Sequence, residues 1–98
     1  MNTFVILSDL DDSALPIIRS LAEQTEDLNL VLLSDSVFLL NDLSNDFFNH
    51  LENHGVNVYA MREDVDKRNP QNKGILNLID YEALVDLLLT ERVRVINL

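Results

Sequence analysis

The chain has 98 residues, 47% of them hydrophobic, a length and composition typical of one globular domain. Its formal net charge of −10, from 17 acidic and 7 basic residues, argues against direct binding along a nucleic-acid backbone, which needs clustered Lys and Arg. No cysteine is present, which excludes disulfides and Cys-ligated metals, and no leader-like or membrane-length apolar run is found, which predicts a cytosolic protein.

The first third of the chain predicts two buried strands separated by a helix. Thr3–Ser8 is an almost continuous apolar run, which is typical of a strand buried on both faces. Asp12 or Ser13 can cap the helix that follows, and apolar residues recur at helical spacing as far as Gln24. Leu28 and the run Leu30–Leu33 predict a second apolar strand, LNLVLLS, that ends at Ser34 and Asp35.

The middle of the chain predicts helical structure and then a third strand. Ser36–Asp42 and Leu43–His54 have the pattern of two short helices, with a single bent helix as the alternative. Ser44 is the expected cap of the second helix, and Gly55 is expected to end it in the left-handed region. Val56–Met61 is the third strand.

The last third predicts two more strands and a helix between them. Asp80 is placed to cap that helix, and Leu84, Val85 and Leu88 are expected on its core side. The alternation of apolar and charged residues at the end favours a half-exposed edge strand. The elements are a helical turn at Glu63–Arg68, a loop at Asn69–Gly74, a strand at Ile75–Ile79, a helix at Tyr81–Leu89 and a strand at Arg92–Asn97.

Strands that alternate with helices predict a mostly parallel five-stranded sheet with helices on both faces, a three-layer α/β sandwich. Crossovers are expected to be right-handed. Because the first strand is so uniformly apolar, we expect it at the centre, in the flavodoxin-like order 2-1-3-4-5. All 98 residues are expected to form one domain.

Asp11 and Asp12 follow the first strand and are similar to the acidic pair with which receiver domains hold Mg²⁺. A receiver also needs an aspartate where the third strand ends, and here that strand ends in Met61 and Arg62. Helix capping explains the two acids more simply.

His50 and His54 are four residues apart on a predicted helix, a spacing that can place two imidazoles over one metal ion. The sequence HLENH differs from the HExxH pattern of zinc proteases, and no third ligand is indicated. We therefore favour a solvent-facing helix surface and predict no metal site.

The chain offers little for catalysis or for cofactors. Its only glycines are Gly55 and Gly74, and neither follows the first or second strand, so no phosphate-binding loop and no cofactor are predicted. The serines at strand ends have no histidine placed to activate them. An enzyme that uses strand-end carboxylates is the remaining catalytic alternative, and we predict that the chain is not an enzyme.

Four patches in order along the chain resemble the DsrH/TusB family, the small subunits of the DsrE-like sulfur-relay group. The family pattern is an apolar strand ending in Asp-Gly, a "VYA" strand followed by an acid and Arg-Gly, and an "IDY" helix start. The patches are Val31-Leu32-Leu33-Ser34-Asp35-Ser36-Val37, Val58-Tyr59-Ala60 with Asp64, Arg68, and Ile79-Asp80-Tyr81 with Leu84-Val85.

The sequence departs from this pattern at three positions. Ser36 replaces the glycine after Asp35, so that turn is expected to be built differently. Asn69 replaces the glycine after Arg68, a mild change because Asn tolerates positive φ. Some members carry a cysteine in the first helix, where this chain has Ser20 when counted without gaps.

The resemblance implies a cytoplasmic, non-catalytic subunit of a sulfur-relay complex with DsrE/TusD-like and DsrF/TusC-like partners. Such complexes pass persulfide sulfur toward 2-thiolation of the wobble uridine in tRNA. The alternative is a DsrH-like homodimer that serves as a protein-interaction module outside any relay. The acidic charge agrees with a soluble surface, or with a partner that has a basic face. The expected interface residues lie at the strand ends and in the turns that follow: Asp35, Ser36, Tyr59, Arg62, Asp64 and Arg68.

Overall fold

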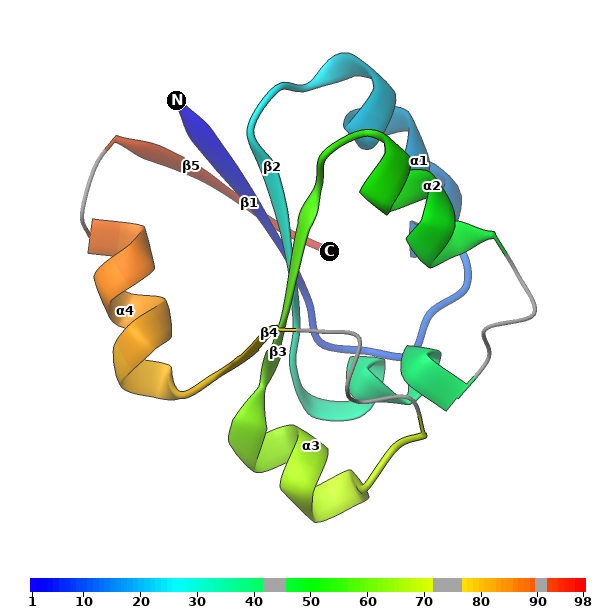
Figure 1. The fold of residues 1–98 in the computed structure, drawn as a ribbon, viewed down its shortest axis with the longest axis vertical. Coiled ribbons are helices and arrows are strands. Elements are labelled where there is room, and N and C mark those ends of the chain that lie inside the picture. Colours follow the sequence, from blue (N-terminus) through cyan, green and yellow to red (C-terminus); the bar gives the residue numbers. More distant parts are fainter. Residues whose placement is uncertain (42–45, 72–76, 90–91) are drawn as a thin grey trace.

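The computed structural model describes residues 1–41, 46–71, 77–89 and 92–98. All five strands of the described chain belong to one sheet (Figure 1). In chain order the elements are β1 (Asn2–Leu7), α1 (Ala14–Gln24), β2 (Leu28–Leu32), the 3-10 helix η1 (Ser34–Asn41), α2 (Phe47–Asn53), β3 (Asn57–Met61), α3 (Arg62–Arg68), β4 (Asn77–Ile79), α4 (Tyr81–Leu89) and β5 (Val93–Asn97).

The sheet is parallel at every pairing, which confirms the predicted α/β class. Its order is β4-β3-β2-β1-β5, which corrects the expected order 2-1-3-4-5. The central strand is β2 rather than β1. All five residues of β2 are buried, whereas Asn2 and Ile6 of β1 are only partly buried. The second apolar run was therefore the better indicator of the centre, and β5 lies at the edge, as its alternating pattern predicted.

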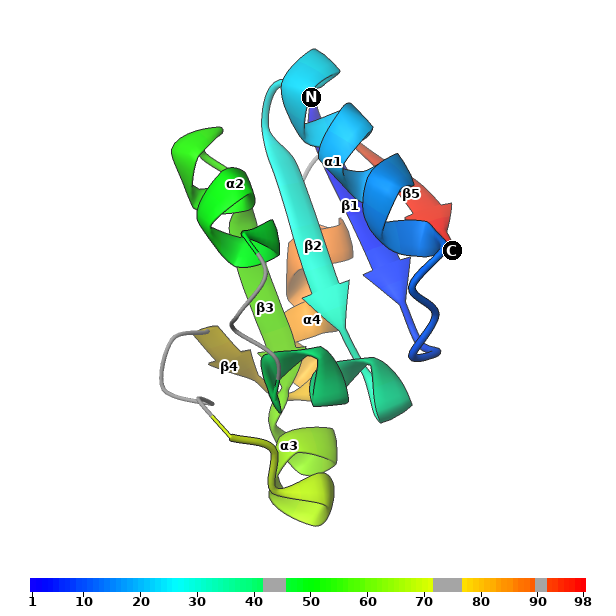
Figure 2. The same cartoon turned by 90° about the vertical axis from the view of Figure 1, so that its right-hand side faces the viewer.

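Helices cover the two faces of the sheet unequally (Figures 1 and 2). The α1, α2 and η1 helices lie on one face, over a large core that includes Ile18, Leu30 and Phe47. Among the described residues, α4 is the one helix on the opposite face, over a smaller core that includes Met61 and Leu84. The α3 helix follows β3 directly, beyond the carboxyl ends of the strands. In the described part of the chain, several helices thus cover one face of the sheet and a single helix covers the other.

The α4 helix has the predicted bounds, but its buried side is narrower than expected. Leu84, Leu87 and Leu88 pack toward the sheet, a spacing of three and four residues along one helix face. Val85 was expected in the core and is 49% exposed. With one helix on this face, the residues pointing away from the sheet remain in solvent. The amide of Ala83 donates a hydrogen bond to the Asp80 carboxylate at 2.8 Å, as the predicted cap requires.

Two turn predictions are confirmed by backbone angles. Gly55 has φ 73° after α2, and Asn69 has φ 46° after α3, so Asn does occupy a left-handed position there. Ser13 precedes α1, but its side chain makes no cap to the helix and donates to Asp11 Oδ1 instead.

Three predictions fall outside the described residues: the Ser44 cap, the Gly74 turn and the start of the fourth strand at Ile75. Within the described part of the chain, no helix is long and apolar enough to cross a bilayer.

Candidate functional site at the strand ends

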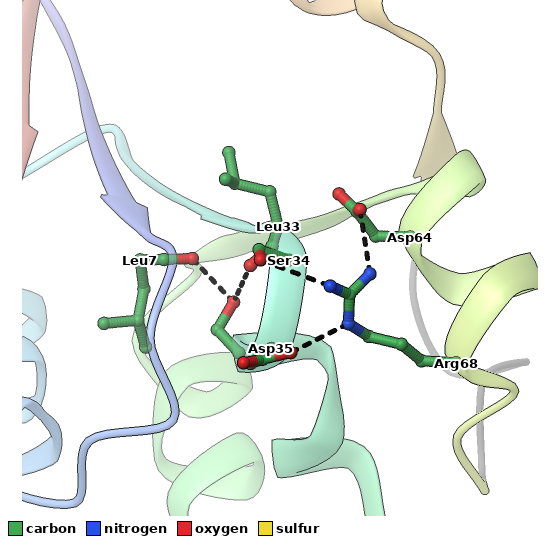
Figure 3. A network of polar contacts seen from close by, with 7 residues as sticks. Leu7, Leu33, Ser34, Asp35, Asp64 and Arg68 are labelled. Carbon is green, nitrogen blue, oxygen red and sulfur yellow. Dashed lines mark hydrogen bonds and ion pairs between the residues drawn. The ribbon is translucent and has the colours of Figure 1, made fainter.

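The guanidinium of Arg68 joins two segments that follow neighbouring strands (Figure 3). Its Nε donates to Asp35 Oδ1 at 3.0 Å, its Nη1 to Asp64 Oδ1 at 3.1 Å and its Nη2 to Ser34 Oγ at 3.4 Å. Asp35 and Ser34 lie at the start of η1 after β2, and Asp64 lies in α3 after β3. We call these four residues the Arg68 cluster.

Local backbone geometry creates the cluster. Parallel strands end at the same edge of a sheet, so the segments after β2 and β3 begin side by side. Ser34 has φ 55°, which turns the chain sharply from β2 into η1 and directs Asp35 toward α3. Asp64 and Arg68 are four residues apart on α3 and therefore share one face of that helix.

Ser36 follows Asp35 of the cluster in η1 and is fully buried. Its hydroxyl is 2.6 Å from the carbonyl oxygen of Leu7 and 2.8 Å from that of Leu33, so its single hydrogen is shared between two strand ends. The amide of Leu33 also donates to the Leu7 carbonyl at 3.1 Å. The serine that replaces the family's glycine thus fastens the end of β2 to the end of β1.

The side chains of the Arg68 cluster differ in how far they are buried. The side chains of Arg68 and Asp64 are 19% and 16% exposed, whereas that of Asp35 is 62% exposed. Asp64 Oδ2 is buried and has no hydrogen-bond partner among the described residues. The one guanidinium faces two carboxylates, so the cluster is net acidic. The hydrogen bonds and ion pairs of Arg68 link η1 to α3, and we call this link a clasp.

The expected interface residues separate into groups. Asp35, Asp64 and Arg68 meet in the cluster, with Asp35 as its exposed member. Arg62 is exposed at the start of α3. Tyr59 points to the opposite face of the sheet, where it packs with the α4 side of the core. Whether these residues form an interface stays a prediction.

A pocket of about 300 Å³ lies between the sheet and α4, near the amino ends of the strands. Sequence reasoning missed it, although an Asn inside the apolar run of the second strand was a signal. Asn29 is 3% exposed; its amide donates to the Thr3 carbonyl, and its side-chain oxygen accepts from Asn57 at 3.1 Å. The lining residues are Asn2, Phe4, Asn29, Asn57, Tyr59, Leu87 and Val93.

The histidine pair also has a neighbour that the sequence did not indicate. Glu23 of α1 lies beside His50 and His54, and one ligand atom from each of the three falls within 4.8 Å of the others. Sequence spacing could not reveal this acid, because it belongs to a different helix.

Comparison with known proteins decides the family. The family model described as DsrH like protein matches residues 7–93. The chain belongs to the DsrH-like family. No curated protein matches this DsrH-like chain. Among solved structures, a conserved protein of unknown function from Bacteroides thetaiotaomicron shares the fold, with a TM-score of 0.75 and 11% identity. The alignment covers 99% of this chain and 95% of that one.

Family membership supports a general role as a subunit in sulfur relay. The residues that carried the resemblance have a physical connection in the structure of this DsrH-like chain. The acid after the second strand, the acid after the third strand and the following arginine are Asp35, Asp64 and Arg68, and all three meet in the Arg68 cluster. The family pattern therefore coincides with a clasp that holds the strand ends together.

Proposed function

We propose that this DsrH-like chain is a non-catalytic subunit of a cytoplasmic sulfur-relay complex. In this proposal it assembles with DsrE/TusD-like and DsrF/TusC-like proteins and supports persulfide transfer toward 2-thiolation of tRNA wobble uridine. One observation carries the proposal: the family match spans residues 7–93, yet the sequence has no cysteine. A persulfide forms on a thiolate, so a partner must carry the sulfur.

An apolar stripe on α4 supports a role in assembly. Tyr81, Val85 and Leu89 are four residues apart, so they share one side of the helix. They are 49%, 49% and 78% exposed. Apolar side chains aligned in solvent often mark a protein contact. The stripe lies on the outer side of α4, which is the one helix of the described residues over this face of the sheet, and a second subunit can pack against it.

The charge distribution favours protein partners over RNA. The net charge of −10 repels a phosphate backbone and attracts a subunit with a basic face. We therefore assign tRNA contact to the partners and give this chain the task of holding them.

The test is an affinity pull-down of the tagged chain from its native host at endogenous level, with mass spectrometry of the bound proteins. We expect small DsrE-like proteins, at least one with a reactive cysteine. Val85→Asp should release them. Ile17→Asp is the matched control, because Ile17 is an aliphatic helix residue with 50% exposure on α1, over the opposite face. Recovery of the chain without any such protein would overturn the relay role.

A homodimer is the second candidate, and the exposed edge of β5 favours it. Among the described strands, β5 pairs with β1 alone, and Val95 on it is 42% exposed, so a second copy could pair with its outer edge. Light scattering of the purified chain separates the candidates: a stable dimer that ignores DsrE-like proteins favours self-association, and a monomer that binds them favours the relay complex.

A further inference from the structure

Glu23, His50 and His54 meet on the outer surface of α1 and α2, away from the Arg68 cluster. The last turn of α1 supplies the acid, while α2 and its final cap supply the histidines (Figure 2). The two imidazole rings lie side by side, with centroids 4.4 Å apart. They are the only histidines in the sequence, so any histidine-dependent property of the protein arises here.

The spacing of the ligand atoms suits a small metal ion. Tetrahedral zinc with bonds of about 2.0–2.1 Å places neighbouring ligand atoms about 3.3 Å apart. His50 Nε2 and Glu23 Oε1 are already 3.4 Å apart. The remaining ligand atom lies within 4.8 Å of both, and the residues that must rotate to close this distance, Glu23 and His54, are exposed. The adjustment therefore disturbs no packed core.

The ring nitrogens are prepared to bind a metal. His54 Nδ1 lies 2.9 Å from the carbonyl oxygen of His50. A carbonyl only accepts, so Nδ1 carries the proton and Nε2 keeps its lone pair. A hydrogen bond from one ring nitrogen to a carbonyl is the usual support of a ligating histidine. His50 Nε2 is buried without a hydrogen-bond partner among the described residues, and it lies 3.4 Å from Glu23 Oε1.

We propose that Glu23, His50 and His54 form a binding site for a divalent transition metal, with Zn²⁺ the best fit. Two imidazoles and one carboxylate are a usual set of three protein ligands for zinc. The acidic protein also concentrates cations at its surface. Because HLENH lacks the base of HExxH, the metal's role is to fasten α1 to α2 rather than to activate water for hydrolysis.

The first test is titration of the full, tag-free chain with Zn²⁺ by calorimetry and by thermal unfolding. We expect one ion per chain and a melting temperature that rises with zinc. Glu23→Gln, His50→Gln and His54→Gln should each weaken binding by at least about tenfold. Glu52→Gln is the matched control: it removes the same charge from an exposed site on α2, between the two histidines in sequence, and should leave the affinity unchanged.

Imidazole ¹⁵N NMR spectra distinguish zinc bound to the histidines from zinc attracted nonspecifically to the acidic protein surface. Zinc should shift the Nε2 signals of both histidines and leave His54 Nδ1 protonated. The proposal is overturned if the wild-type chain shows no saturable zinc binding, if Glu52→Gln weakens binding as much as Glu23→Gln, or if His54 binds through Nδ1. The absence of cysteine means that no thiolate competes for the ion in these experiments.

Discussion

Replacing Arg68 with methionine tests whether the Arg68 cluster is a clasp. Methionine keeps most of the apolar stem and removes the guanidinium. Asp64 then keeps a carboxylate that is 16% exposed and has lost its donor, which costs about 1–3 kcal/mol. Asp35 is 62% exposed and adds less than about 1 kcal/mol. We therefore expect Arg68→Met to lower the free energy of unfolding by about 2–3 kcal/mol.

Urea unfolding followed by circular dichroism measures this loss, with the slope of the transition checked for constancy. At about 4–8 °C per kcal/mol for a domain of this size, the melting temperature should fall by about 8–24 °C. Asp35→Asn should cost no more than about 0.5 kcal/mol, because its pair is exposed. The double variant Arg68→Met/Asp64→Leu should be more stable than Arg68→Met alone, because no unpaired carboxylate remains.

Two results would refute this reasoning. If Asp35→Asn costs as much as Arg68→Met, the exposed contact rather than the buried one carries the energy. If the double variant is no more stable than the single one, the isolated carboxylate of Asp64 is not the source of the loss.

Three further predictions concern the turns. Ser36→Ala should cost about 1–3 kcal/mol, because two strand-end carbonyls lose their shared donor, while Ser20→Ala at an exposed position should be neutral in the same urea assay. Asn69→Val should be less stable than Asn69→Gly, because φ 46° costs a branched residue about 1–2 kcal/mol; equal melting temperatures would contradict this. The hydroxyl and amide of Ser13 lower the pKa of Asp11, so Ser13→Ala should raise that pKa in an NMR titration. Since the folded pKa is depressed, the stabilisation by Asp11 is present above its unfolded pKa and is lost as the pH falls through the folded value; an unchanged titration would contradict the assigned cause.

The features that depend on local sequence patterns were predicted correctly from the sequence. The α4 helix has the predicted bounds, β5 is the edge strand, and Asn69 takes the left-handed position left by a missing glycine. The strand order was not predictable in this way, because β1 and β2 are similar apolar runs and only long-range packing decides which is central. Val85 was misplaced for the same reason: its exposure depends on how many helices share that face.

In the candidate site, too, the sequence identified some residues, and the fold alone revealed the others. Family resemblance selected Asp35, Asp64 and Arg68 as separate positions, and the fold showed that they touch. Ser34 was missed because its contribution depends on a positive φ, which no sequence pattern at that serine indicates. Glu23 was missed because its neighbours lie on another helix, 27 and 31 residues later in the chain.

The distribution of these features fits the proposed role in assembly. Open α/β sheets usually bind ligands beyond the carboxyl ends of their strands. In this chain the Arg68 guanidinium and the buried Ser36 hydroxyl fasten the segments at that edge to one another. The apolar stripe of α4 lies on the thinly covered face instead, with side chains that the domain's own core does not use. We propose that a sulfur-carrying partner docks on this stripe, and Val85→Asp tests that proposal without touching the clasp.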